Sequence, residues 1–369
     1  MHSPTGTCRL FGLLSLTLAA LVPVASAAQE KIVNVYNWND YIDPKVLDDF
    51  TRETGIKVVY DTYDNNEIVE TKMLAGKSGY DIVVPSGPFL QRLIVAGVFD
   101  KLDKSRLPNT KHLWPDVARK LSVYDPGNQH AINYLWGTTG IAINVDKVKQ
   151  RLGDVPLNSW DLVLKRSVAE KLKDCGIYVL DAPEDVFPGV LRYLGVEPSS
   201  KNPNDIVKAA DHLMKIRGLV RKFHSSEYIN ALAAGDICVA VAYSGDALQA
   251  RKRAEEANNG VKIEYLIPKE GALMWFDSFV IPKDAPNKDA AYKFLDFMLR
   301  PDIAARNSNL VSYASGNLAA KAEIKPEIIN NPNVYPDDKT FARLFTNTAY
   351  DDRVQKVVTR QWTRVKTGK

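Results

Sequence analysis

The sequence has few cysteines, no marked excess of charge of either sign and no long apolar run. It contains 48 Lys and Arg against 44 Asp and Glu, and a formal net charge of +4 is small for 369 residues. Faces that bind nucleic acid are normally strongly basic, so the charge gives no support for a nucleic-acid partner. No stretch of twenty apolar residues is present, which excludes a membrane-spanning helix in the mature chain. The remaining composition is that of a globular protein, and a chain of this length usually divides into two domains.

Motifs for catalysis and for metal binding are also missing. The sequence has no GxSxG elbow, no GxGxxG after a strand, no P-loop and no HExxH. The four histidines beyond the N-terminal segment, His112, His130, His212 and His224, lie far apart and lack the spacing of metal ligands. Asp181 and Asp185 could be imagined as a glycosidase pair, but two acids in one loop are common by chance. We therefore predict no enzyme activity, no metal and no cofactor.

The first 27 residues have the three regions of a secretory signal peptide. A short segment with Arg9 precedes an almost wholly apolar run from residue 10 to 22, and the small residues Ala25, Ser26 and Ala27 follow. This order predicts export and cleavage after Ala27. The alternative is a buried N-terminal helix. Cys8 precedes the apolar run, so it is not placed for lipid attachment.

Cleavage would leave two cysteines, Cys175 and Cys238. An exported protein can pair two thiols in an oxidising compartment. Closing that long loop would stabilise the fold by about 4 kcal/mol. Two separately buried thiols are the alternative.

Strands and helices alternate along the mature chain. The strands are expected at residues 31–38, 56–63, 80–85, 236–243, 261–267 and 274–281. The helices are expected at residues 43–55, 65–76, 89–97, 247–258 and 287–299. On the last of these helices Ala291, Phe294, Leu295 and Met298 share one face and should pack in the core. This alternation predicts an α/β protein with βαβ units and parallel sheet.

Aromatic residues and carboxylates recur together where predicted strands end. These segments are Trp38 to Tyr41, Ser86, the acids Asp181, Glu184 and Asp185, Tyr243 to Asp246, and Trp275 to Asp277. Ligands of open α/β sheets bind beyond the carboxyl ends of strands. A carboxylate among aromatic rings suits an organic cation, because it accepts charge-assisted hydrogen bonds while the ring faces attract the cation. The alternative is that Asp40 and Asp246 cap helices and that the aromatic residues close the core.

Several longer segments resemble the periplasmic polyamine-binding proteins, the putrescine- and spermidine-binding subunits of ABC importers. They are YNWNDYI (36–42), ETGIKVVYD (53–61), YDIVVPS (80–86), LDAPED (180–185), FHSSEYINALAAGDICVA (223–240), IPKEGA (267–272), WFD (275–277) and TRQWTRVKTGK (359–369). The resemblance extends from about residue 32 to residue 369, and the combined motifs are highly specific.

The resemblance implies a two-lobed periplasmic binding protein fold of type II, in which each lobe is a mixed, mostly parallel sheet flanked by helices. We expect residues 28–136 plus 260–303 in lobe 1 and residues 137–259 plus 304–369 in lobe 2. The ligand would lie in the cleft between the lobes, which close by hinge motion. The resemblance also implies a disulfide bond between Cys175 and Cys238, location in the periplasm, a polyamine ligand and an ABC permease in the inner membrane as partner. We expect a monomer.

By position, the resemblance implies ligand contacts for eleven residues. Trp38 and Tyr243 would pack on the methylene groups of the ligand, and Trp275 would form another wall. Asp246 and Asp277 would hold ammonium groups, and Asp185 would take the opposite end of the ligand. The polar rim would comprise Asn39, Tyr41, Ser86 and Tyr313, with Asp40 near the mouth.

The identity of the ligand is left open at this stage. Trp275 with Phe276, and Tyr243 with the residues that follow it, look like the spermidine-preferring relatives. Four positions depart from the putrescine-binding pattern: Asn39, Pro88, Ile143, and Thr348 in place of a lysine. Loss of that lysine could admit a longer or more cationic ligand, whereas the asparagine and proline could reshape the site for agmatine, cadaverine or an ω-amino acid. A sensor for such an amine, and more remotely a secreted enzyme acting on amines, are the alternatives.

Overall fold

Strands and helices alternate at the start of residues 31–369, the part of the chain that the computed structural model describes. The first six elements are β1 (Ile32–Trp38), α1 (Pro44–Thr54), β2 (Lys57–Tyr63), α2 (Asn66–Ala75), β3 (Ile82–Val83) and α3 (Gly87–Val95). The strands form a parallel sheet, as the sequence predicted, and their order is β2-β1-β3. The predicted signal peptide and its cleavage site lie outside the described residues.

Local sequence signals explain where α1 begins and ends. The Asp43 side chain accepts a hydrogen bond from the Lys45 backbone N–H at 3.0 Å, and Pro44 occupies the first turn. Gly55 ends the helix in the left-handed conformation, with a φ of 67°. Asp43 therefore caps the helix that follows β1, and the alternative that Asp40 is this cap was wrong.

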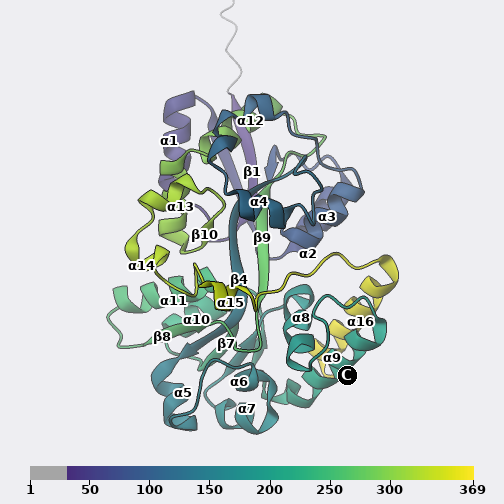
Figure 1. Ribbon diagram of the computed structural model, residues 1–369, viewed down its shortest axis with the longest axis vertical. Helices are drawn as coiled ribbons and strands as arrows, with labels where there is room; N and C mark the ends of the chain where they lie inside the picture. The colour runs from purple at the N-terminus through teal and green to yellow at the C-terminus, as the bar shows by residue number, and fades with distance from the viewer. Residues whose placement is uncertain (1–30) are drawn as a thin grey trace, which may run out of the picture. The chain divides into compact units, whose positions relative to one another are not determined.

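A larger sheet is built around β4 (Ile132–Asn144), whose thirteen residues are all buried. The main order is β10-β4-β7-β5-β6, and β8 and β9 also pair with β4. These strands are β5 (Ile177–Val179), β6 (Lys222–Phe223), β7 (Val239–Tyr243), β8 (Ile263–Leu266), β9 (Leu273–Phe279) and β10 (Ala314–Ser315). Figure 1 shows β4 and β9 running side by side through the middle of the described chain, between its upper and lower groups of helices.

The pairing around β4 corrects one detail of the expectation. β5 pairs in parallel with β6 and β7, but β7, β8, β9 and β10 all pair with β4 in antiparallel fashion. The mostly parallel pairing therefore applies to the first sheet, and the second sheet is mixed.

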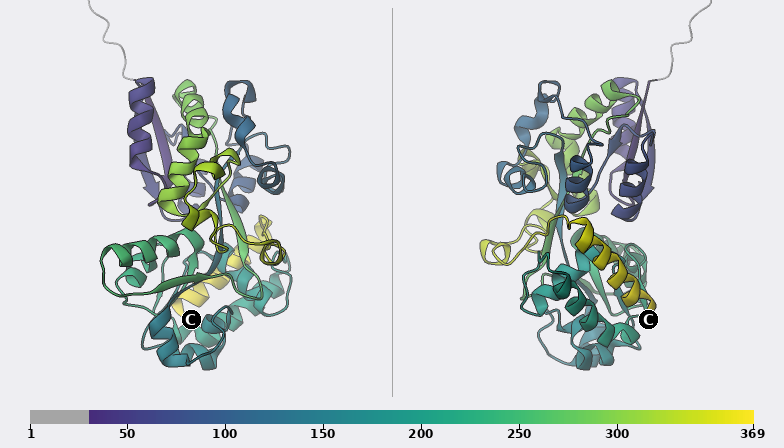
Figure 2. Two further views of the ribbon diagram at one scale, coloured as in Figure 1. Left: turned by 60° about the vertical axis from the view of Figure 1, so that its left-hand side comes forward. Right: turned by 90° about the vertical axis from the view of Figure 1, so that its right-hand side faces the viewer.

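Helices cover both sheets. The remaining α-helices are α4 (Pro115–Leu121), α5 (Val145–Leu152), α6 (Asp161–Leu164), α7 (Arg166–Leu172), α8 (Pro183–Tyr193), α9 (Pro203–Ile216), α10 (Tyr228–Ala233), α11 (Ser244–Glu256), α12 (Lys288–Met298), α13 (Pro301–Val311), α14 (Pro326–Ile329), α15 (Asp338–Phe341) and α16 (Asp352–Thr367). The C-terminal helix α16, drawn in yellow in Figure 2, packs against α8 and α9. On α12 the four predicted core residues are buried, which confirms that prediction. None of the helices in residues 31–369 is both long and apolar enough to cross a membrane.

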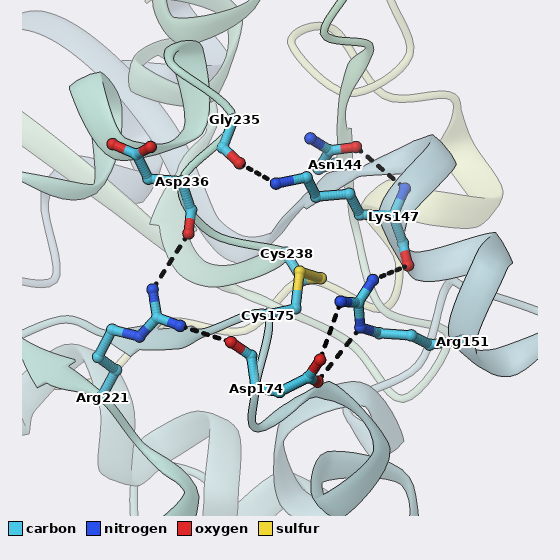
Figure 3. The surroundings of a disulfide bond; sticks show 9 residues. All are labelled: Asn144, Lys147, Arg151, Asp174, Cys175, Arg221, Gly235, Asp236 and Cys238. Carbon is cyan, nitrogen blue, oxygen red and sulfur yellow. Dashed lines mark hydrogen bonds and ion pairs between the residues drawn. A yellow bond between two sulfur atoms is a disulfide. The ribbon is translucent and has the colours of Figure 1, made fainter.

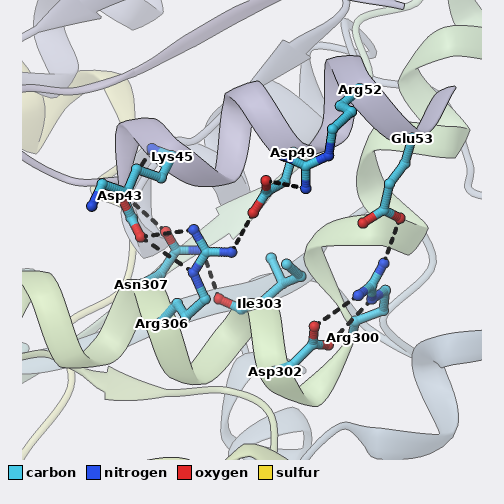
Figure 4. A network of polar contacts seen from close by, with 10 residues as sticks. All are labelled: Asp43, Lys45, Asp49, Arg52, Glu53, Arg300, Asp302, Ile303, Arg306 and Asn307. Atoms are coloured by element: carbon cyan, nitrogen blue, oxygen red, sulfur yellow. Dashed lines mark hydrogen bonds and ion pairs between the residues drawn. The ribbon is translucent and has the colours of Figure 1, made fainter. Parts of the chain in front are cut away.

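Ion pairs join α13 to α1 (Figure 4). Arg306 pairs with Asp43 at 3.2 Å and with Asp49 at 2.5 Å, and Arg300 pairs with Glu53 at 2.7 Å. The prediction assigned α1 to lobe 1 and residues from 304 onward to lobe 2. These contacts favour a boundary beyond α13, and the division into lobes stays a prediction.

A disulfide bond joins Cys175 to Cys238 across 63 positions of the sequence. Both cysteines are buried and lie just before β5 and β7, two neighbouring strands. Arg221 supports the same loops by donating to the backbone carbonyls of Asp174 and Asp236 at 2.8 and 3.1 Å (Figure 3). The predicted pairing is therefore confirmed, and the alternative of two separate thiols was wrong.

Candidate functional site

All eleven residues predicted to contact a ligand line one cleft. They are Trp38, Asn39, Asp40, Tyr41, Ser86, Asp185, Tyr243, Asp246, Trp275, Asp277 and Tyr313. They come from segments far apart in the sequence: the end of β1, the start of α3, the first turn of α8, the junction of β7 and α11, β9, and the loop before β10. The structure thus brings the predicted residues together, and their individual roles in binding stay predictions.

Asp277 lies on β9 with only 4% of its surface exposed. Its carboxylate accepts a hydrogen bond from the Tyr41 hydroxyl at 2.6 Å and one from the Ser86 hydroxyl at 2.5 Å. Burial raises the pKa of Asp277 to about 7, although the two hydrogen bonds favour the charged form. An ammonium group beside Asp277 would therefore favour the ionised form of this carboxylate.

Asp246 lies in the first turn of α11, and two tyrosines hold its carboxylate. The Tyr228 hydroxyl donates to Oδ2 at 2.7 Å and the Tyr313 hydroxyl donates to Oδ1 at 2.5 Å. Burial raises the pKa of Asp246 to about 6, against the effect of these two bonds. The N-cap position of α11 is occupied by Tyr243, so the alternative that Asp246 is the cap was wrong.

Asp185 lies in the first turn of α8 and accepts a hydrogen bond from the Tyr243 hydroxyl at 3.0 Å. Burial raises the pKa of Asp185 to about 8, and the nearby acids Glu67, Glu184 and Asp277 raise it further. Of the cleft acids Asp185, Asp246 and Asp277, Asp185 therefore needs a cation most in order to ionise.

Aromatic rings form the walls around these acids. The ring centroids of Tyr243 and Trp275 are 5.7 Å apart, and those of Trp275 and Tyr313 are 5.2 Å apart, both in edge-to-face packing. The Trp38 indole is held by a hydrogen bond from Nε1 to the Val84 carbonyl at 3.0 Å. Rigid rings of this kind can pack on methylene groups and attract a cation with their faces.

The mouth of the cleft contains Asn39 and Asp40. Asp40 has a positive φ of 52°, and its carboxylate accepts a hydrogen bond from Arg253 of α11 at 3.2 Å. Asn39 is the only one of the four departures from the putrescine-binding pattern that lines the described cleft, because Pro88, Ile143 and Thr348 lie elsewhere. Ile143 is a fully buried core residue of β4.

The sequence did not single out six further lining residues: Tyr63, Asp64, Asn66, Ser225, Ser226 and Ile229. Ser225, Ser226 and Ile229 lie within the FHSSEYINALAAGDICVA segment, whose resemblance to the polyamine-binding proteins could have identified them as site residues. Tyr63, Asp64 and Asn66 lie at the end of β2 and the start of α2, the same type of position as the predicted residues. The strand-end argument would have found them if it had been applied to β2.

The described lining carries charge of one sign only. It contains five carboxylates, those of Asp40, Asp64, Asp185, Asp246 and Asp277, and no Lys, Arg or His. Within residues 31–369 no group of His, Cys, Asp and Glu could hold a metal ion. Buried carboxylates between aromatic walls favour a cation that also carries apolar atoms.

Comparison with known proteins gives a family and close relatives. The sequence model described as "Bacterial extracellular solute-binding protein" matches residues 45–336. The chain is 51% identical to the putrescine-binding periplasmic protein SpuD of Pseudomonas aeruginosa over 97% of this chain and 98% of that protein. It is 50% identical to the putrescine-binding periplasmic protein PotF of Escherichia coli over 98% of each chain.

The fold has a solved counterpart as well. The structure of a putative spermidine/putrescine ABC transporter from Listeria monocytogenes matches with a TM-score of 0.82 and 32% identity, over 92% of this chain and all of that one. This similarity confirms the two-lobed type II fold. The chain therefore belongs to the bacterial extracellular solute-binding proteins: it is a periplasmic binding protein and not an enzyme.

Proposed function

We propose that this chain captures a linear polyamine, spermidine or putrescine, in the cleft and delivers it to the permease of an ABC importer. The observation that carries the proposal is the lining of five carboxylates and aromatic rings, without a described Lys, Arg or His. The names of the relatives at 50 and 51% identity, which are putrescine-binding periplasmic proteins, support the same class of ligand.

The energies are adequate for tight binding. Micromolar affinity needs about −8 kcal/mol. Two or three charge-assisted hydrogen bonds contribute roughly 1.5–3 kcal/mol each. Cation–π contacts with rings such as Trp38 and Trp275 add up to about 2 kcal/mol. Burial of the ligand's methylene groups, at about 0.8 kcal/mol each, offsets part of the cost of association, so the total is of the order that micromolar affinity requires.

Isothermal titration calorimetry of the mature chain tests the proposal. The protein is unfolded, dialysed and refolded to remove any bound amine, then titrated with putrescine, cadaverine, agmatine, spermidine and 5-aminovalerate. We expect saturable binding of spermidine or putrescine. No heat with any di- or polyamine would refute the proposal, and a response to 5-aminovalerate alone would reassign the ligand to an ω-amino acid.

Two cleft variants and one surface variant complete the test. Asp277→Asn and Asp246→Asn each remove one cleft carboxylate, and we expect affinity to fall at least about 30-fold, the equivalent of roughly 2 kcal/mol. Asp289→Asn is the matched control, because Asp289 has 93% of its side chain exposed and lies outside the cleft. If Asp289→Asn weakened binding as much as Asp277→Asn, the effect would be general electrostatics and not a site.

Delivery to a permease is tested separately in cells. Deletion of the gene should abolish uptake of labelled polyamine at low concentration, and the wild-type gene should restore it. Unchanged uptake with a lost transcriptional or behavioural response would favour a sensor. We also expect the binding protein to be a monomer and not to bind nucleic acid, which gel filtration and a DNA-binding assay would measure.

A further inference from the structure

Tyr228 contacts the site from behind, without lining the cleft. It is the first residue of α10, and none of its surface is exposed. Its hydroxyl donates to Asp246 Oδ2 at 2.7 Å and accepts from the Tyr243 backbone N–H at 3.1 Å. One buried oxygen therefore links a cleft carboxylate to the backbone of a cleft aromatic residue.

Tyr243 extends the same connection to the second acid. It is the last residue of β7 and occupies the N-cap position of α11, so its backbone sets where both elements meet. Its own hydroxyl donates to Asp185 Oδ2 at 3.0 Å. Tyr228 thus contacts one acid directly and the residue that holds the other.

We propose that Tyr228 is a positioning residue for amine binding, which keeps Asp246 oriented toward the cleft and fixes the β7–α11 junction so that Tyr243 meets Asp185. This inference rests on the proposed function. The tyrosine does not touch the ligand and acts through the two residues that it bonds.

The charge state of Asp246 depends on its surroundings, so the loss of one donor has a directional effect. Asp246 interacts with seven other titratable groups through hydrogen bonds or charge: Tyr41, Tyr228, Tyr243, Tyr313, Asp40, Asp277 and Arg253. A hydroxyl that donates to a carboxylate favours its ionised form. Removing the Tyr228 donor therefore favours a protonated Asp246, which binds an ammonium group poorly.

Tyr228→Phe tests the inference, because phenylalanine fills nearly the same volume and removes only the hydroxyl. We expect the dissociation constant for the preferred amine to rise about tenfold at pH 6, as for the loss of one hydrogen bond to a charged group. The difference should shrink at pH 8.5, where Asp246 is ionised in both proteins. In the Asp246→Asn background the same substitution should have a smaller effect, because only the hydrogen bond from the Tyr243 backbone is then lost.

Tyr265→Phe is the matched control. Tyr265 is also fully buried, and its hydroxyl donates to the Thr138 carbonyl at 2.9 Å and not to a cleft carboxylate. It should lower the melting temperature and leave the dissociation constant unchanged. The inference is overturned if the Tyr228→Phe variant binds the amine with the wild-type dissociation constant at pH 6. It is also overturned if Tyr228→Phe raises the dissociation constant by the same factor in the Asp246→Asn background as in the wild-type protein.

Two further outcomes are separable. Wild-type protein that binds no amine refutes the proposed function, whereas wild-type binding with an unaffected Tyr228→Phe refutes only the positioning role. If Tyr228→Phe does not fold, NMR of the wild-type protein replaces it. The chemical shift of the Tyr243 amide should then change with pH as Asp246 titrates, and it should become independent of pH in Asp246→Asn. A Tyr243 amide shift that does not change as Asp246 titrates would overturn the inference.

Discussion

Three acids of the cleft share an unusual electrostatic state. Burial raises the pKa values of Asp246, Asp277 and Asp185 to about 6, 7 and 8, so neutral pH falls inside their titration range. Hydroxyl groups hold all three carboxylates, and no described base lines the cleft beside them. An ammonium group in the cleft favours their ionised forms, so amine binding and proton release are coupled.

Amine affinity should therefore depend on pH. The ligand stays protonated up to about pH 9, because alkyl ammonium groups titrate near 10. Since the acids must ionise to bind it, affinity should rise as the pH increases from 5.5 to 8.5, and protons should be released at pH 7. Calorimetry in two buffers of different ionisation enthalpy measures both quantities. Affinity that is constant over this range, or a net uptake of protons, would contradict the assignment of these acids.

Arg92 neutralises another buried acid beside the cleft. Glu184 is 4% exposed, and its carboxylate lies 3.0 Å from Arg92 Nη1, while Arg92 also pairs with Glu70 at 2.6 Å. Arg92→Met would leave Glu184 buried without its cation, which should lower the free energy of unfolding by about 3–5 kcal/mol. Chemical denaturation measures this loss.

Adding Glu184→Gln to Arg92→Met provides the control. The double variant removes the unpaired charge, so it should recover most of the lost stability. If the double variant is as unstable as Arg92→Met, the loss comes from packing of the arginine and not from the buried charge of Glu184.

Prediction from sequence went furthest for residues whose neighbours along the chain define them. Trp38 to Tyr41 and Trp275 to Asp277 stood at predicted strand ends or within a quoted motif, and all the predicted site residues line the cleft. Tyr228 was part of a quoted motif, but its role depends on partners in α11 and β7 that only the fold brings together. Likewise the capping alternatives for Asp40 and Asp246 were rejected because the structure places Asp43 and Tyr243 at the two N-cap positions.

Among the elements, β4 supplies the backbone against which the aromatic walls pack. Gly137 of β4 faces the Trp275 ring so closely that an added Cβ would lie 2.6 Å from Cζ2. Gly245 of α11 has the same relation to Tyr313, where the distance would be 2.5 Å. These glycines let the Trp275 and Tyr313 rings approach the neighbouring backbone closely.

Gly137→Ala should displace Trp275 and weaken amine binding about tenfold, since overpacking of this kind costs about 1–3 kcal/mol. Gly218→Ala is a suitable control, because nothing lies within 4 Å of its added Cβ and its φ is not in the left-handed region. Calorimetry with the preferred amine measures the effect. Equal affinities for Gly137→Ala and wild type would mean that the position of Trp275 does not matter for binding.

The elements were predicted unevenly. Local sequence signals mark the first four elements, because strands alternate with helices there and the helices have caps and terminal glycines. The predicted bounds of β1, α1, β2 and α2 agree with the structure to within one or two residues. β4 is buried along both faces, so its sequence shows no period of two, and no strand was predicted over residues 132–144. Its antiparallel neighbours come from distant parts of the chain, and no local pattern records such pairings.

For the molecule as a whole, the disulfide bond adds stability away from the site. Neither Cys175 nor Cys238 lines the cleft, and the bond closes a loop of 63 positions. Replacing both cysteines by alanine should lower the free energy of unfolding by about 4 kcal/mol. Amine affinity, measured below the melting temperature, should not change. A folded double variant with a much weaker affinity would show that the disulfide bond also supports the cleft.

The central claim is that the carboxylates of Asp185, Asp246 and Asp277 hold the ammonium groups of a linear polyamine between aromatic walls. A crystal structure of the protein with spermidine or putrescine bound tests it most directly. The account predicts ammonium nitrogens about 2.7–2.9 Å from carboxylate oxygens of the cleft, with methylene groups packed on Trp38, Tyr243 and Trp275. An amine bound elsewhere on the protein, or bound in the cleft with no nitrogen near these three acids, would contradict it.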